Sequence, residues 1–314
     1  MHIKLHGLRT VSVLVSLSCG LVAATASTPR AEKLYAPAGV AAGGRQLVWT
    51  KKNPLSDPGC YQAVVVNGVV YVARHEGRKA YLLTHDPVAD AWSPRIPLLL
   101  EKPKDGEIAV LNGRIYYHGG RERDDRRSLT MEEYDPSTAR SRILNGPERD
   151  AIRAALGPEL GGEFPSRAET WHWGTYRIGE RRFVLSSVRG SGVVDVCELP
   201  PGSDKVERRT TMPRPRIDSA VVAADGKLYF FGGWTSGSAV SDLIDSYDPV
   251  TGRWEEVGRM TQPKWGVGMI YQAGQFVLIG GKTTGWSDRD GGYIDSVETL
   301  EIRSPAAVWP AAPE

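Results

Sequence analysis

The feature of this 314-residue sequence that most constrains its fold is an apolar strand that recurs along the chain and ends in a glycine doublet in three of its five copies. Five apolar strands share this pattern, and their last residues are Arg74, Gly120, Ser187, Gly233 and Gly281. The spacings between these positions are 46, 67, 46 and 48, so the long spacing equals one period plus an insertion of 21. A period in the forties that contains several short strands predicts a blade of a β-propeller.

Turn signals divide each period into four strands. Two-residue turns that suit positive φ angles follow the first strand, as in Asn67-Gly68, Asn112-Gly113 and Asp225-Gly226. A later turn carries an aspartate, as in "HDPVADAW", "YDPSTARS" and "YDPVTGRW". We expect four aspartates to accept hydrogen bonds from backbone amides rather than to act as catalysts: Asp86, Asp135, Asp245 and Asp248.

A glycine doublet, then Tyr247, then Trp254 after six intervening residues, resembles the kelch repeat. The resemblance covers roughly residues 60–303. It implies four-stranded antiparallel blades around a central axis, with the doublets in tight backbone contacts and the repeat's Tyr and Trp buried between sheets. The match is uneven, because Ala73-Arg74 and Ser186-Ser187 replace two of the doublets.

The predicted fold class is therefore all-β, a kelch-type β-propeller of five or six four-stranded blades within one domain, 27–314. The blades are expected near 60–100, 103–146, 167–212, 214–260 and 262–310. The insertion, near 147–165, predicts one short helix with Pro147 at its start and an apolar stripe of Ala151, Ile152, Ala155 and Leu156. An N-terminal strand near 45–51 would close the ring, because an open sheet edge promotes aggregation. A partial sixth blade could use "KLYAPAGV".

The N-terminal segment, 1–26, predicts an export signal. Lys4 and Arg9 precede a short apolar core, and Ala24-Thr25-Ala26 gives a cleavage pattern of small residues. The protein is thus expected to be periplasmic or extracellular. A lipoprotein anchored at Cys19 is the alternative, although Ser16 stands where lipid-attachment sequences usually carry Leu. We expect no membrane span, because no segment has about 20 consecutive apolar residues.

Without the predicted signal, 37 basic residues face 37 acidic ones, and the mixed signs give no reason to expect a nucleic-acid partner. The two remaining cysteines, Cys60 and Cys197, could pair or stay as free buried thiols. The remaining histidines lack metal-like spacing: His75, His85, His118 and His172. We expect no metal, no cofactor and a monomeric protein.

The long second turns and the insertion fall on one end of the propeller, and variable loops on a rigid scaffold usually carry function. The ligand-binding candidates on this loop face are Tyr61, Arg121, Trp171, His172, Trp234, Trp265 and Trp286. The weaker catalytic candidates are Glu169, Arg216, Asp218 and Lys264. Each has a structural alternative: Trp171 and Trp265 begin apolar strands and could be core residues, and Arg214 and Arg216 could form a surface ion pair.

The resemblance implies several classes of function. The first interpretation is a non-catalytic exported protein that binds a protein or a carbohydrate through its variable loops. The alternative is an enzyme similar to the periplasmic sialic-acid mutarotases, which would need acid and base groups converging at the channel mouth. A copper oxidase of the galactose-oxidase type is disfavoured by the scattered histidines. The convergence of Glu169, Arg216, Asp218 and Lys264 would distinguish the first two classes.

Overall fold

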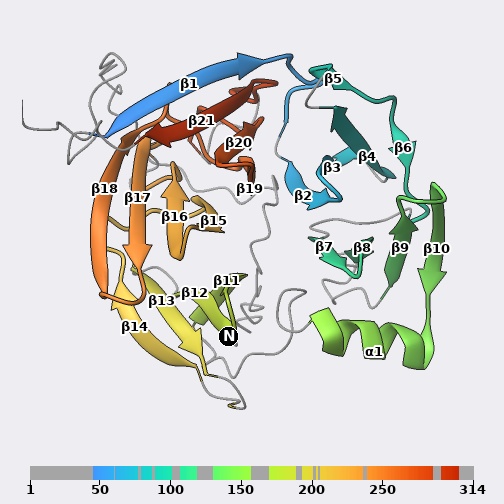
Figure 1. The fold of residues 1–314 in the computed structure, drawn as a ribbon, viewed down its shortest axis with the longest axis horizontal. Helices are drawn as coiled ribbons and strands as arrows, with labels where there is room; N and C mark the ends of the chain where they lie inside the picture. Colours follow the sequence, from blue (N-terminus) through green and yellow to red (C-terminus); the bar gives the residue numbers. More distant parts are fainter. Residues whose placement is uncertain are drawn as a thin grey trace, which may run out of the picture.

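The computed structural model describes residues 45–303, apart from 60, 77–78, 87–88, 101–106, 119–129, 157–169, 189–192, 201–202, 204–205, 236–238 and 286–290. Its strands form five sheets placed around a common axis, which is a five-bladed β-propeller (Figure 1). The prediction of an all-β propeller is confirmed, and the ring has five blades. The segment proposed for a partial sixth blade lies outside the described residues, as does the predicted export signal.

The blades follow one another along the chain. Blade 1 contains β2 (Gln62–Val66), β3 (Val69–Glu76), β4 (Lys79–Asp86) and an outer edge split into β5 (Ala91–Trp92) and β6 (Ile96–Pro97). Blade 2 contains β7 (Glu107–Leu111), β8 (Arg114–His118), β9 (Met131–Asp135) and β10 (Arg140–Leu144). Blade 3 contains β11 (Thr170–Ile178), β12 (Arg181–Val188), β13 (Val194–Leu199) and β14 (Glu207–Thr211).

The last two blades complete the ring. Blade 4 contains β15 (Ala220–Ala224), β16 (Lys227–Phe231), β17 (Leu243–Asp248) and β18 (Arg253–Arg259). Blade 5 contains β19 (Gly268–Gln272), β20 (Gln275–Ile279), β21 (Val297–Arg303) and, as its outer strand, β1 (Gln46–Lys52). The N-terminal strand β1 pairs antiparallel with β21, from Gln46 opposite Arg303 to Lys52 opposite Val297. The predicted closing strand is therefore confirmed.

The tight turns have the predicted chemistry. Asn67, Asn112 and Asp225 have φ angles of 51°, 51° and 48°, and each is followed by a glycine with positive φ, as two-residue hairpin turns require. In the later turns, Asp86, Asp135 and Asp248 accept backbone N–H bonds from residues two or three positions ahead. These three predictions are confirmed, whereas Asp245 has a different role, described below.

Apolar clusters at the junctions between blades form the core. One cluster joins blades 3 and 4, where Tyr247 is buried and Trp254 packs against it with ring centroids 5.2 Å apart. Similar clusters join blades 4 and 5, blades 5 and 1, and blades 1 and 2. Cys197 is a buried free thiol in blade 3, and burial raises its pKa to about 11. Cys60 lies outside the described residues.

Helix α1 (Gly146–Leu156) lies between blades 2 and 3 (Figure 1). Its Leu156 is fully buried and packs with Ile152 against Ala109, Tyr116 and other apolar residues of blade 2. The helix thus covers a sheet face that a neighbouring blade covers at the other four junctions. Its apolar stripe is narrower than predicted, because Ala151 and Ala155 are exposed. No helix in the described part of the chain is long and apolar enough to span a bilayer.

Candidate functional site

The glycine doublets shape the loop face of blades 4 and 5. Gly232 and Gly233 follow β16 with φ angles of +58° and +95°. A Cβ atom on Gly232 would collide with the carbonyl oxygen of Lys264, and one on Gly233 would lie 2.7 Å from the Ile217 carbonyl oxygen. Only glycine accommodates both the positive φ and this close approach of neighbouring backbones. The strand stops here because the chain must turn past the adjacent blade.

Beyond each doublet, the chain forms a second short ladder. Trp234 pairs antiparallel with Ile217 on one side and Val240 on the other, with backbone N–H···O distances of 2.8 and 2.9 Å to Ile217. In blade 5, Lys282 occupies the equivalent place between Trp265 and Tyr293. The residues that follow the doublets therefore stand on a hydrogen-bonded framework rather than on an irregular loop, which fixes their side chains at the loop face.

Asp218 and Trp234 form the central contact of this region. The indole Nε1–H of Trp234 donates to Oδ2 of Asp218 at 2.8 Å. Asp218 is 6% exposed, and its other oxygen, Oδ1, is buried without a hydrogen-bond partner among the described residues. Burial raises the pKa of this carboxyl to about 6, although the indole hydrogen bond opposes the rise. Trp234 is half-buried.

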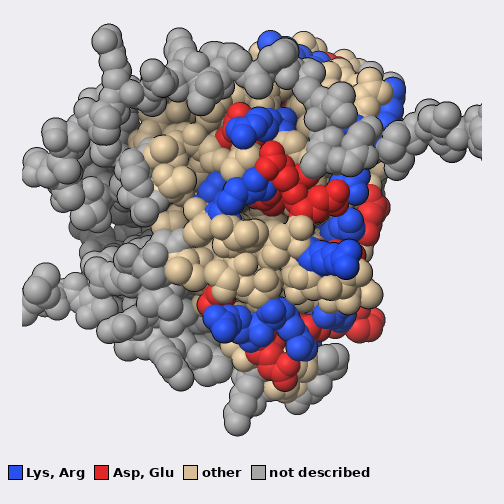
Figure 2. All heavy atoms as spheres, turned by 90° about the vertical axis from the view of Figure 1, so that its left-hand side faces the viewer, with Lys and Arg blue, Asp and Glu red and all other residues tan. Residues whose placement is uncertain are grey.

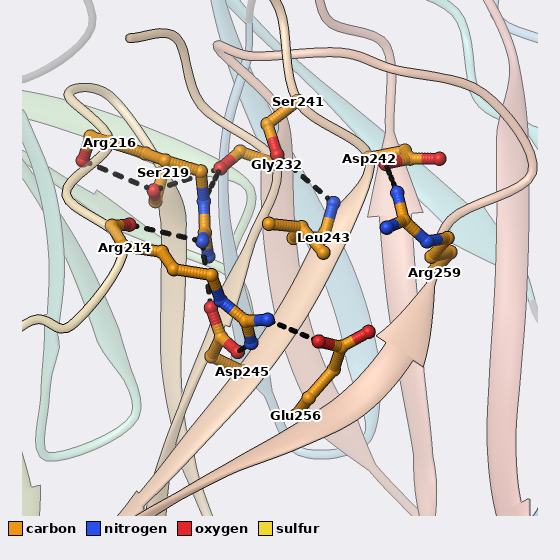
Figure 3. Close-up of polar contacts among 10 residues, drawn as sticks. All are labelled: Arg214, Arg216, Ser219, Gly232, Ser241, Asp242, Leu243, Asp245, Glu256 and Arg259. Carbon is orange, nitrogen blue, oxygen red and sulfur yellow. Dashed lines mark hydrogen bonds and ion pairs between the residues drawn. The ribbon is translucent and has the colours of Figure 1, made fainter. Parts of the chain in front are cut away.

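Arg216 is buried in an ion pair below the doublet of blade 4. It donates from Nη1 to Asp245 Oδ2 at 2.7 Å and from Nε to the Gly232 carbonyl oxygen at 2.7 Å. Arg214 approaches from the other side and bridges Asp245 and Glu256, as Figure 3 shows. Arg216 and Asp245 are each 2% exposed, so the ion pair of Arg216 is buried rather than on the surface as expected, whereas Arg214 is half-exposed. The prediction that Asp245 forms a turn is wrong, because its carboxylate binds both arginines.

Lys264 repeats this arrangement at the start of blade 5. It is fully buried and pairs with Glu298 of β21, which also accepts a hydrogen bond from Thr261 Oγ1 at 2.7 Å. Burial lowers the pKa of the Lys264 ammonium group, and the neighbouring carboxylate opposes this. Asp245 pairs with Phe230 across the strands, and Glu298 pairs with the equivalent Leu278. The same kind of buried ion pair thus occurs in blades 4 and 5, between a basic residue before the inner strand and an acidic residue on the third strand.

Two more predicted residues occupy packed positions near the loop face. Trp265 is 2% exposed and donates its indole N–H to the Thr284 carbonyl oxygen at 2.7 Å. The Lys282 Nζ lies 5.9 Å from the centroid of the Trp265 ring and 5.0 Å from that of Tyr293, within cation–π distance. Tyr61 is buried beneath Arg74, which donates to its hydroxyl at 3.0 Å.

The remaining predicted site residues cannot be placed. Glu169, Arg121 and Trp286 lie outside the described residues. Trp171 and His172 lie in β11, but their side chains are not among those described. Among the described candidates, Arg216, Asp218 and Lys264 each bind a different partner, namely Asp245, Trp234 and Glu298. The roles assigned to all these residues stay predictions.

Charges of both signs are interspersed on the side of the propeller that carries β17 and β18 (Figure 2). Ion pairs account for this pattern, including Arg45 with Glu255 at 2.7 Å and Arg259 with Asp242 at 2.6 Å. This side therefore has no extended field of one sign among its described residues. Within the described ranges, no cluster of three His, Cys, Asp or Glu side chains could hold a metal ion.

Sequence reasoning missed the acidic partners of the buried pairs, Asp245 and Glu298. A signal was available: Arg216 and Lys264 stand at equivalent places in consecutive periods, and each repeat carries an acid on its third strand. The contact between Asp218 and Trp234 has no such signal, because the two residues are 16 positions apart and belong to different turns.

Comparison with known proteins identifies the repeat in blade 4. The Kelch motif family matches residues 215–261. Kelch-like protein 21 of Rattus norvegicus is 32% identical over 110 residues, which are 33% of this chain and 18% of that protein. Kelch repeat and BTB domain-containing protein 13 of Homo sapiens is 31% identical over 118 residues, 36% of this chain and 25% of that protein. The matched part thus spans a quarter or less of these relatives.

A solved structure of the protein YjhT covers 80% of this chain and 99% of its own, with 12% sequence identity and a TM-score of 0.44.

Proposed function

Because this chain is a kelch-repeat β-propeller, we propose that it is an exported, non-catalytic binding protein that holds a protein or glycan on the loop face of blades 4 and 5. Kelch propellers commonly serve as protein-interaction modules. The loop face is proposed because the tight turns of the opposite face are short and uniform, whereas the chain beyond each doublet varies from blade to blade.

One observation carries the proposal: a half-buried tryptophan stands at the loop face on a rigid ladder. The backbone of Trp234 is fixed by its pairing with Ile217, and its indole is oriented by Asp218. A partly exposed aromatic ring that is already oriented loses little conformational entropy when a ligand binds. Such a ring suits both the side chains of a protein and the apolar face of a sugar.

Arrays of peptides and glycans, probed with the purified protein, test this proposal. We expect binding to one ligand class and at least a tenfold loss in Trp234→Ala, because aromatic anchors commonly contribute about 2 kcal/mol or more. Val250→Ser is the matched control, since Val250 is 83% exposed in a tight turn on the opposite face. Equal binding by the wild type and Trp234→Ala would show that the ligand does not bind at the loop face of blade 4.

Export is supported by the charged start, the apolar core and the Ala24-Thr25-Ala26 pattern of the N-terminal segment. Cell fractionation, with N-terminal sequencing of the recovered protein, tests it. Recovery of a chain that begins at Ser27 outside the cytoplasm is the expected result. An uncleaved chain confined to the cytoplasm would contradict it, and a lipid on Cys19 would favour the anchored alternative.

We do not extend the proposal to a sugar mutarotase. That activity would need acid and base groups acting on one substrate. Among the described candidates, Arg216 and Lys264 are each held in a separate buried ion pair. No contact between described residues specifically favours the enzyme.

A further inference from the structure

One backbone position differs informatively between blades 4 and 5. Ile217 and Trp265 are equivalent, because they pair with Trp234 and Lys282, respectively. The residue after each has a left-handed conformation, with φ of +55° at Asp218 and +68° at Gly266. The fold therefore requires only a residue that tolerates positive φ here, and glycine meets that requirement in blade 5. The backbone conformation at this position therefore does not depend on the carboxylate of Asp218.

This carboxylate opposes folding at neutral pH. It is buried, it forms no ion pair with a described residue, and its Oδ1 has no hydrogen-bond partner in the described part of the chain. Leaving a carboxylate oxygen buried and unsatisfied costs free energy, as does ionising an acid away from water. The raised pKa of Asp218 reflects the same cost. The hydrogen bond from Trp234 recovers only part of it, and it uses the other oxygen, Oδ2.

We propose that Asp218 and Trp234 form a recognition site for a cationic side chain, arginine or lysine, of a partner protein. This inference rests on the proposed binding function and specifies its ligand. Oδ1 supplies an unused acceptor for a charge-assisted hydrogen bond, and the indole supplies a π face beside it. A cation is the group that both features favour, because it neutralises the carboxylate and is attracted to the ring. A protein partner is favoured because kelch propellers commonly serve as protein-interaction modules.

Oδ1 is covered in the free protein, so the cation reaches it through a small movement of the side chains around the carboxylate. The backbone of Trp234 can stay in place during this movement, because two hydrogen bonds of 2.8 and 2.9 Å tie it to Ile217. Binding is therefore a local side-chain adjustment at a fixed backbone position. The indole N–H donates to the same carboxylate, so its proton resonance reports directly on a cation that binds Oδ1.

Nuclear magnetic resonance of the indole N–H groups tests the proposal. The intact protein, labelled with 15N at tryptophan, is titrated with acetyl-Gly-Arg-Gly-amide, acetyl-Gly-Lys-Gly-amide and acetyl-Gly-Gln-Gly-amide, and Trp234→Phe assigns the Trp234 resonance. We expect the arginine or lysine peptide to shift this resonance, with the neutral glutamine peptide at least tenfold weaker. The two cationic arms show which side chain is preferred.

Two substitutions isolate the carboxylate. Asp218→Asn keeps the shape of the side chain, and Asp218→Gly places there the residue that blade 5 carries at Gly266, so the backbone conformation stays favourable. Both variants should bind the cationic peptide at least tenfold more weakly, because a buried charge partner is lost. Asp248→Asn, which alters an exposed carboxylate in a turn on the opposite face, should bind as the wild type does.

The result separates this inference from the broader proposal. Unchanged peptide affinity in Asp218→Gly, equal binding of the glutamine peptide, or no binding of either cationic peptide would overturn the inference. If the arrays still yield a ligand whose binding is lost in Trp234→Ala, the loop face remains a binding surface and only its assignment to a cation is wrong.

Discussion

Among single residues, Asp218 shows how environment decides the role of a side chain. Asp248, in a repeat turn, is near solvent and accepts backbone N–H bonds, which lower its pKa. Asp218 is buried with one indole donor, and its pKa rises to about 6. The same residue type therefore stabilises a turn at one end of the blade and opposes folding at the other.

The pH dependence of stability provides a test at this scale. The folded pKa of Asp218 lies above the ordinary 3.8, so its contribution is most favourable below pH 3.8 and is lost as the pH rises through about 6. The neutral amide of Asp218→Asn does not carry this cost. We expect the unfolding free energy of Asp218→Asn, relative to that of the wild type, to rise by roughly 2 kcal/mol between about pH 4 and pH 7. Urea unfolding at several pH values measures it.

Asp248→Asn gives a control of opposite sign. Backbone hydrogen bonds lower the pKa of Asp248, so its stabilising contribution is present at neutral pH and is lost as the pH falls through the lowered value. This variant should be less stable than the wild type at neutral pH and approach it in acid. Parallel pH profiles for the wild type and Asp218→Asn would show that Asp218 titrates normally in the folded protein.

Among the structural elements, the glycine doublets of blades 4 and 5 each couple their blade to the next one. The Gly233 N–H donates to the Lys264 carbonyl oxygen at 3.1 Å, and the Gly281 N–H donates to the Gly59 carbonyl oxygen at 2.8 Å. The same segments carry the buried pairs of Arg216 with Asp245 and of Lys264 with Glu298. The doublet thus forms the turn and also contributes hydrogen bonds to the junction between blades.

Gly232→Val tests the doublet. The new side chain would require a positive φ of a β-branched residue and would collide with the Lys264 carbonyl and the Met260 methyl group. We expect a loss of roughly 3 kcal/mol or more in unfolding free energy, measured by denaturant titration. Gly252→Ala is the control, because Gly252 also has positive φ (+71°) but faces open space, and its cost should be about 1 kcal/mol. Equal losses would mean that φ alone matters.

In the whole molecule, the propeller is closed by pairing between its two ends. β1 supplies the outer strand of blade 5, and blade 5 packs through its inner strand against blade 1. At the junction between blades 2 and 3, helix α1 packs against blade 2. The apolar cluster at this junction contains no described residue of blade 3. Stability therefore depends on contacts between β1 and β21, the first and the last strands along the described chain.

Removal of the closing strand tests this dependence. A variant that begins at Asn53 lacks β1, which leaves β21 as an unpaired edge that can recruit other chains. We expect a lower melting temperature and self-association, measured by thermal unfolding and size-exclusion chromatography. A variant that begins at Arg45 keeps β1 and serves as the control. A monomeric Asn53 variant with an unchanged melting temperature would show that the closure contributes little.

The fold was largely predictable because its signals are local and repeated. Two-residue turns such as Asn67-Gly68 and the glycine doublets that end three of the strands recur at a nearly constant period, and each repetition strengthens the prediction. The site was less predictable. Arg216 and Lys264 were recognised as candidates, but their pairing with Asp245 and Glu298 was seen only in the packed structure.

The amino-acid sequence was thus sufficient to predict the blade, its turns and the strand that closes the ring, since these follow from backbone preferences and alternation within short segments. The three-dimensional packing was needed to show which charges are paired and which are not. It pairs Arg216 with an acid 29 positions away and leaves Asp218, two positions later, with an indole and one oxygen unsatisfied among the described residues. The physical reason is that burial and hydrogen-bond geometry are properties of packed neighbours, which one-dimensional spacing does not specify.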